Sequence, residues 1–285
     1  MEALIAGLFG LIIGSFINVL VLRYPARSLG GRSMCMSCGG EIAWYDNIPL
    51  FSWIFLRGHC RRCGSAISVQ YPLVEATTGA IFALVSASSD ISAGISGLYA
   101  AALLIPMLFI AALLIAIATY DIKHTIIPDA WAYTFAATAF LYGGAIALVQ
   151  PGYGLVLFLL AGPLAALPLF ALWLVTKGRW MGLGDSKLAL GIGWLLGPLY
   201  GPFAVLFAFI IGAVVSVPLL FFSSRAWRDI VARFTPTRAS PKPHGGFTMG
   251  SEIPFGPFLT LSCIIVWLSL INGIEPLAML GLLPS

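Results

Sequence analysis

LYAAALLIPMLFIAALLIAIAT, residues 98–119, is a stretch of 22 residues without a charged side chain, and Tyr120 and Asp121 follow it directly. An α-helix rises 1.5 Å per residue, so a stretch of this length can cross the hydrocarbon core of a bilayer. Backbone N–H and C=O groups find no water there and must bond within the chain, as they do in a helix. The stretch therefore predicts a transmembrane helix that ends in an aspartate.

Apolar stretches of similar kind recur along the whole chain. Hydrophobic residues make up 60% of the 285 residues and charged residues 9%, whereas a soluble domain carries about 25% charged residues. We therefore expect an all-α, polytopic membrane helix bundle of about eight transmembrane helices. The predicted spans are 3–22, 73–89, 98–119, 131–149, 153–176, 186–198, 201–222 and 255–273, of which the second and the sixth are short.

The basic residues predict the orientation of this bundle. With eight spans, all 15 Lys and Arg residues fall on one side of the membrane. Basic loops stay in the cytosol during insertion, so we expect a multi-pass protein with both termini outside the cytosol. The bilayer accounts for the net charge of +4, and no nucleic-acid partner is expected.

The spans divide the chain into three predicted regions. Residues 1–22 are the first transmembrane helix, which lacks the basic start of a signal peptide and is expected to be retained. Residues 23–72 are a cytosolic loop. Residues 73–285 are the remaining membrane core, with a second cytosolic loop at 223–254.

The first cytosolic loop contains two C-x2-C pairs separated by 21 residues: Cys35, Cys38, Cys60 and Cys63. Four thiolates at this spacing can surround a tetrahedral Zn²⁺, and glycines at 39, 40 and 64 permit the tight turns this requires. Two disulfides or four free thiols are the alternatives, although a cytosolic location disfavours disulfides. We expect a structural zinc without an open coordination position. Cys263 lies in the last span and is expected to be buried.

Asp121 and Asp185 are separated by two predicted spans, so both are expected at the same cytosolic end of the bundle. Two nearby carboxylates share one proton, and such a pair can activate water and protonate a leaving amine. Gly182 and Gly184 would let a substrate strand approach Asp185. The alternative is that both acids pair with Lys123 and Lys187 at the interface. Asp129 is expected to cap the fourth helix.

In combination, these motifs resemble the bacterial type IV prepilin peptidases, also called leader peptidase/N-methyltransferases, of the membrane aspartic protease family A24. The resemblance covers nearly the full length of the chain. It rests on both cysteine pairs, Asp121, GLGD at 182–185 and several shorter motifs. These are GSFINV (14–19), RYP (23–25), NIP (47–49), RGHC (57–60), YPLVE (71–75), IPD (127–129) and IPFGPF (253–258).

The resemblance implies two activities in the bacterial inner membrane. The first cleaves the basic leader from prepilins or pseudopilins after a glycine, with Asp121 and Asp185 as the catalytic pair. The second methylates the new N-terminus with S-adenosylmethionine, and the resemblance associates the cysteine loop at 23–72 with this methyltransferase activity. It also implies that the four cysteines bind metal. Glu75 is a candidate for contact with the substrate's N-terminus or the methyl donor, or is simply an acid placed favourably at a helix start.

Other classes fit less well. A presenilin or signal-peptide-peptidase type protease shares the YD and GxGD patterns, but this chain has no Pro-Ala-Leu motif near its C-terminus. A proton-coupled transporter would place carboxylates near mid-membrane and show related repeats. A zinc metalloprotease would carry H-E-x-x-H. The sequence leaves open the particular client protein, the metal occupancy and the oligomeric state.

Overall fold

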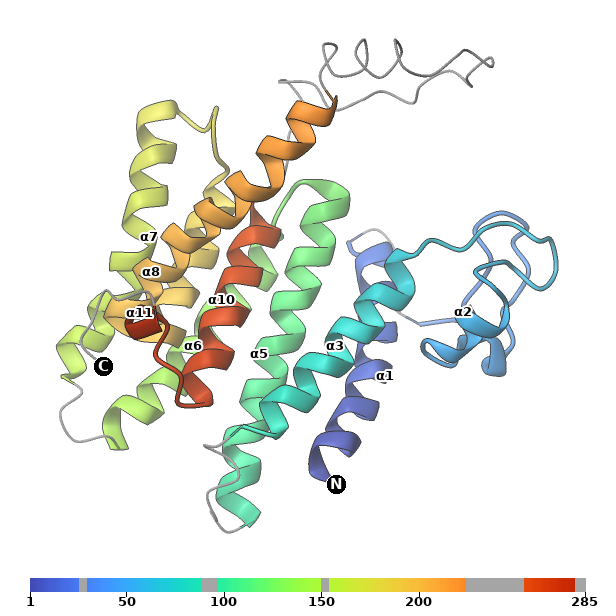
Figure 1. The fold of residues 1–285 in the computed structure, drawn as a ribbon, viewed down its shortest axis with the longest axis horizontal. Coiled ribbons are helices and arrows are strands. Elements are labelled where there is room, and N and C mark those ends of the chain that lie inside the picture. The colour runs from blue at the N-terminus through green and yellow to red at the C-terminus, as the bar shows by residue number, and fades with distance from the viewer. Residues whose placement is uncertain (26–29, 89–96, 150–153, 224–253, 280–285) are drawn as a thin grey trace.

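The computed structural model describes residues 1–25, 30–88, 97–149, 154–223 and 254–279 (Figure 1). Most of these residues are helical. No strand occurs within the described ranges, which contain only two isolated β-bridges. The elements are α1 (Glu2–Arg23), the 3-10 helix η1 (Trp44–Asn47), α2 (Phe51–Phe55), α3 (Gln70–Ser86), α5 (Gly97–His124), α6 (Asp129–Val149), α7 (Leu155–Thr176), α8 (Leu183–Ser223), α10 (Gly256–Ile271) and α11 (Pro276–Met279).

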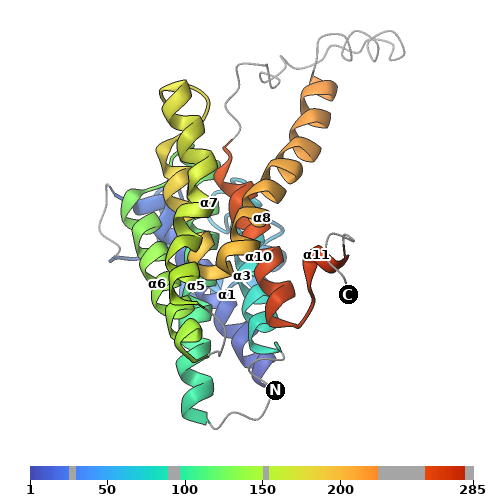
Figure 2. The same ribbon diagram turned by 90° about the vertical axis from the view of Figure 1, so that its left-hand side faces the viewer.

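The predicted all-α membrane bundle is confirmed. Five helices within the described part are long and apolar enough to cross a membrane: α1, α5, α6, α7 and α8. Apolar α3 and α10 are shorter, with 17 and 16 residues. Figure 2 shows the long helices side by side in one bundle, and many large apolar side chains on its outside are exposed, as a lipid-facing surface requires.

The structure contains both the sixth and the seventh predicted spans within α8, which is broken at Gly197. This residue has φ 83° and ψ 178°, which is not helical. In a straight helix, residues 193 and 201 would lie about 12 Å apart. Instead, a Cβ on Gly201 would lie 2.7 Å from the Gly193 Cα. The chain therefore doubles back at Gly197, which explains why the sixth span is too short to cross the bilayer alone.

Glycines also permit the close packing of α1 against α3. A Cβ on Gly10 would lie 2.8 Å from the Gly79 Cα, and a Cβ on Gly14 would lie 2.7 Å from the Glu75 Cα. Small residues let membrane helices approach until their backbones touch. This packing places Glu75, an ionisable residue of α3, directly against α1.

One end of the bundle, which we call the basic end, is defined by where α1, α5 and α7 finish and α3, α6 and α8 begin. Arg23 and Lys123 lie in the last turns of α1 and α5. Lys177 is the C-cap of α7. Short connections, such as 125–128 between α5 and α6, hold these helix ends together. Both predicted catalytic aspartates, Asp121 and Asp185, lie at this end.

Candidate active site

Asp121 lies in the last turn of α5 and is only 4% exposed. Its Oδ2 accepts a hydrogen bond from the backbone N–H of Gly256, 3.0 Å away at the start of α10. A Cβ on Gly256 would lie 2.5 Å from that same Oδ2, so any larger residue would displace the carboxylate or the helix. The last helix of the bundle therefore positions Asp121.

Asp185 lies in the first turn of α8 and is 8% exposed. Its carboxylate lies beside Gly182 and interacts electrostatically with Asp121. No ion pair to either aspartate is found in the described part of the chain. The structure thus brings two buried carboxylates together at one end of the bundle, neither of them in an ion pair with a described residue.

Lys187 pairs with Asp129 instead of with the buried aspartates. Its Nζ lies 2.6 Å from the Asp129 Oδ1, and the Asp129 side chain is 65% exposed. Asp129 is the first residue of α6, whereas an N-cap precedes the first helical residue, and its side-chain hydrogen bond goes to Lys187. The predicted capping role therefore stays a prediction. The pair links the start of α6 to the start of α8. The predicted alternative, in which Asp121 and Asp185 pair with Lys123 and Lys187, is not what the geometry of the described residues shows.

The two glycines before Asp185 have different surroundings. A Cβ on Gly184 would lie 3.1 Å from the Ile127 Cβ, so this glycine lets α8 begin tightly against the 125–128 turn. A Cβ on Gly182 would meet nothing closer than 3.9 Å. A side chain at position 182 would thus meet open space, and the approach of a substrate strand there stays a prediction. Ser186, beside Asp185, has a buried hydroxyl without a hydrogen-bond partner.

The two cysteine pairs adopt matching turns. Cys35 N–H donates to Gly40 O at 2.9 Å and Gly39 N–H donates to Cys35 O at 2.9 Å; Cys60 and Gly64 make the equivalent bonds, at 2.8 and 2.9 Å. Gly39 and Gly64 have φ of 65° and 69°, which only glycine adopts readily. Each turn is closed by one of the isolated β-bridges, Met34 with Glu41 and His59 with Ala66.

The four cysteine sulfurs form a cluster that could hold a metal ion, because they all lie within 4.8 Å of one another. Sulfurs bound to Zn²⁺ at about 2.3 Å in a tetrahedron lie about 3.8 Å apart. The Cys35 and Cys63 sulfurs are 3.8 Å apart, and all four cysteines are free thiols. The disulfide alternative therefore does not apply to this arrangement, and a tetrahedral cation fits it.

The electrostatics of the cluster also favour a cation. The backbone N–H of Cys38 and the Ser65 hydroxyl lower the pKa of Cys35 to about 6. The Gly40 N–H lowers the pKa of Cys38, but the neighbouring Cys35 and Cys63 sulfurs outweigh it and raise that pKa to about 11. Four adjacent thiolates repel one another, and a divalent cation removes that repulsion.

Glu75 is buried, and it connects the cysteine loop to the membrane helices. Its Oε2 accepts a hydrogen bond from the backbone N–H of Leu50 at 2.9 Å. Leu50 is the N-cap of α2 and has φ 61°, an unusual value for a residue other than glycine. Nearby, the Asn18 Nδ2 donates to Tyr71 O at 3.1 Å. These contacts favour an anchoring role for Glu75, while contact with substrate or methyl donor stays a prediction.

Sequence reasoning missed the partners of these carboxylates. Gly256 was expected only as part of a motif, and Leu50 was given no role. For Gly256, the sequence offered one signal: a glycine between Phe255 and Pro257, directly before an apolar span. The hydrogen bond across 135 residues has no signature in the sequence itself.

Comparisons with known proteins bear on the same regions. Residues 8–89, which contain the four cysteines and Glu75, match the bacterial peptidase A24 N-terminal domain. Residues 108–217, which contain both aspartates, match the type IV leader peptidase family. No solved structure shows a significant match.

Several curated relatives carry the name prepilin leader peptidase/N-methyltransferase. The protein from Aeromonas salmonicida is 30% identical over 298 residues, covering 93% of this chain and 89% of the relative. The one from Myxococcus xanthus is 36% identical over 231 residues, covering 76% of this chain and 63% of the relative. The one from Vibrio cholerae is 28% identical and covers 91% and 94%.

Proposed function

This chain belongs to the type IV leader peptidase family, and from that membership we propose that it cleaves the leader from prepilins or pseudopilins and N-methylates the new N-terminus. The observation that carries the peptidase assignment is the buried pair of Asp121 and Asp185. Both belong to the segment that matches the peptidase family. We assign them as the catalytic dyad.

The chemistry follows from the pair's shared proton. Two adjacent carboxylates do not both ionise easily, so one carries a proton and the other is charged. The charged carboxylate takes a proton from water as the water oxygen attacks the scissile carbonyl carbon. The protonated partner donates its proton to the carbonyl oxygen. When the C–N bond breaks, the carboxylic proton passes to the leaving amine, and the other, charged carboxylate takes a proton from a hydroxyl of the gem-diol intermediate, so that the carboxylic acid product forms and the dyad again holds one proton.

The site's place at the end of the bundle suits this reaction. Water reaches the ends of membrane helices but not the hydrocarbon core. We propose that the basic end faces the cytosol in the bacterial inner membrane, as the distribution of Lys and Arg predicts. The substrate's leader then stays in the cytosol, and its apolar helix lies in the bilayer beside the enzyme.

For the second activity we propose that S-adenosylmethionine supplies the methyl group and that the loop at 23–72 takes part in the transfer. The four cysteine sulfurs would hold a structural Zn²⁺, which supplies folding energy to a loop with few buried apolar residues. All four donors come from the protein, so the metal keeps no open position for chemistry. The loop's own residues must therefore position the new amine.

The test is cleavage of a purified prepilin by the wild type, Asp121→Asn and Asp185→Asn, followed by mass spectrometry with S-adenosylmethionine present. Each variant should lose cleavage, because an amide cannot exchange the required proton, and each should still methylate a pre-cleaved peptide. Asp129→Asn is the matched control, an exposed acid at the same end of the bundle. It should retain cleavage.

The possible results separate the alternatives. Substantial cleavage by either dyad variant would overturn the assignment of that aspartate. No cleavage of any prepilin by folded wild type would favour the presenilin-type substrate class. A transporter is the least favoured alternative, because the two carboxylates lie in the last turn of α5 and the first turn of α8 and not at mid-membrane.

A further inference from the structure

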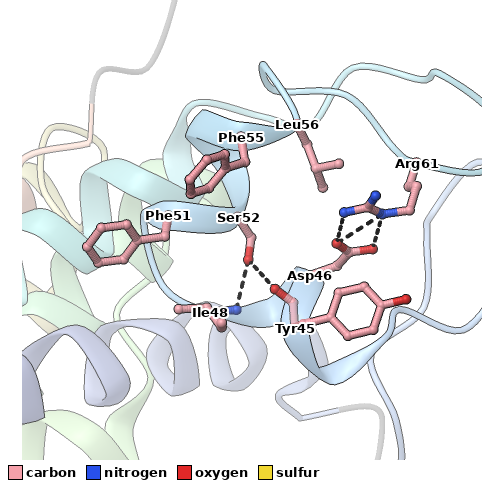
Figure 3. Close-up of a pocket in the computed structure, with 8 residues that line it drawn as sticks. All are labelled: Tyr45, Asp46, Ile48, Phe51, Ser52, Phe55, Leu56 and Arg61. Atoms are coloured by element: carbon pink, nitrogen blue, oxygen red, sulfur yellow. Dashed lines mark hydrogen bonds and ion pairs between the residues drawn. The ribbon is translucent and has the colours of Figure 1, made fainter.

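The cysteine loop exposes a group of large apolar side chains around α2. Trp44 in η1 is 81% exposed, and Phe51 and Phe55 in α2 are 56% and 82% exposed. Figure 3 shows Phe51 and Phe55 pointing the same way from α2, on the side away from the ion pair of Asp46 and Arg61. Such a concentration of exposed aromatic rings on one small loop is unusual for a surface in water.

A pocket of about 360 Å³ opens between η1 and α2, and its lining includes Phe51 and Phe55 on one side and the ion pair of Asp46 and Arg61 on the other. The exposed side chains of Trp44, Phe51 and Phe55 form what we call the α2 face. Its residues do not pack into the core of the bundle, whose members come from the long helices. The α2 face therefore lacks a covering element in the described part of the chain.

The depth of α2 relative to the bundle decides what covers this face. Leu50, directly before Phe51, bonds to Glu75 in the second turn of α3. Leu73, in the first turn of α3, is exposed and apolar, as a lipid-facing residue is. The start of α2 is thus tied to the level at which α3 enters the membrane. In Figure 1, α2 likewise lies at the height of the upper parts of α1 and α3, not above their upper ends.

The charges around α2 fit the same environment. Arg57 and Arg62 are exposed, and neither has an ion pair within the described ranges. Trp and Tyr rings gather at the headgroup level of membranes, Phe rings insert at the boundary between headgroups and acyl chains, and adjacent arginines are attracted to anionic headgroups. A soluble partner would explain the apolar rings, but not their fixed level at the membrane entry of α3.

We propose that the α2 face is seated in the headgroup region of the lipid leaflet at the basic end, with Phe51 and Phe55 inserted among the lipids. The bilayer then holds the cysteine cluster beside the bundle as an additional support to the Glu75–Leu50 bond. This inference rests on the membrane topology and not on the peptidase or methyltransferase activity.

The test places the photoreactive residue p-benzoylphenylalanine at position 55 of the full chain in lipid nanodiscs. Position 84, an exposed residue of membrane helix α3, is the positive control. Position 36, where Met36 is exposed in the first cysteine turn, is the matched control in the same loop. Metal content of each variant reports whether the cysteine cluster is intact. After illumination, mass spectrometry identifies lipid adducts, with and without added prepilin.

Position 55 should form lipid adducts at a yield comparable to position 84 and well above position 36, and the yield should rise with anionic lipid. Absence of lipid adducts at position 55 while position 84 reacts would overturn the proposal. Equal lipid labelling at positions 36 and 55 would also overturn it, because the α2 face would then contact lipid no more than another exposed part of the same loop does. Replacement of the lipid adducts by prepilin adducts would make this face a substrate surface instead.

Discussion

Gly256 holds the most exacting position of any residue around the dyad, because its N–H is bonded to Asp121 and its missing side chain leaves room for that carboxylate. In Gly256→Ala, the added methyl must push Asp121 or α10 aside. Misplacement of a reacting group by about 1 Å costs on the order of 100-fold in rate. We expect a loss of this order in kcat for prepilin cleavage, measured in detergent.

Gly144→Ala is the matched control, since a Cβ there would make ordinary contacts at 3.4 and 3.5 Å with Phe158. This variant should cleave at the wild-type rate. If Gly256→Ala cleaved equally well, the N–H of Gly256 would not be positioning the catalytic carboxylate. A thermal unfolding measurement on both variants shows whether a loss of activity reflects the site or the whole bundle.

Glu75 offers a second test at the scale of one residue. Glu75→Gln keeps an oxygen that can accept from the Leu50 N–H, whereas Glu75→Ala leaves that N–H unpaired at a cost of about 1–3 kcal/mol. Hydrogen exchange of residues 44–56 should be faster in the Ala variant and close to wild type in the Gln variant. If Glu75→Gln also leaves cleavage and methylation unchanged, a charge-dependent contact with substrate or methyl donor is excluded, and anchoring alone remains.

At the scale of elements, the cysteine loop depends on its metal more than the helices do. The loop has few buried apolar residues, while the helices bury a continuous apolar core. Chelation should therefore speed hydrogen exchange in residues 33–66 and reduce methylation, and it should leave exchange in α5 and α8 unchanged. The same protein reloaded with Zn²⁺ is the control. Unaltered exchange in the loop after verified metal removal would contradict a structural role.

The helices differ in how far their sequence determines them. Membrane spans were predictable because lipid permits only a helix, so apolar length alone gave α1, α6 and α7 to within a few residues. Helix α8 was predictable as two spans but not as a sharp hairpin, because that depends on contact between Gly193 and Gly201. Helix α2 was missed because a segment of five residues is too short to show the helical repeat of apolar residues.

Across the whole molecule, crossing parity predicted that Asp121 and Asp185 share one end, and both helix ends lie there in the structure. Parity carries no information about distance or burial. The bond from Gly256 to Asp121 and the pairing of Lys187 with Asp129 arise from packing between helices far apart in the chain. Such contacts depend on tertiary geometry, and a single sequence does not encode them in any local pattern.

The orientation of the whole bundle is itself testable. Arg23, Lys123 and Lys177 lie where α1, α5 and α7 end, and basic segments remain in the cytosol. Alkaline phosphatase fused after Ser285 should be active because it is exported, and green fluorescent protein at the same place should be dark. Fusions after Lys177, the C-cap of α7, should give the opposite pair of results. The reverse pattern at both places would put the dyad outside the cytosol, where a leader retained in the cytosol could not reach it.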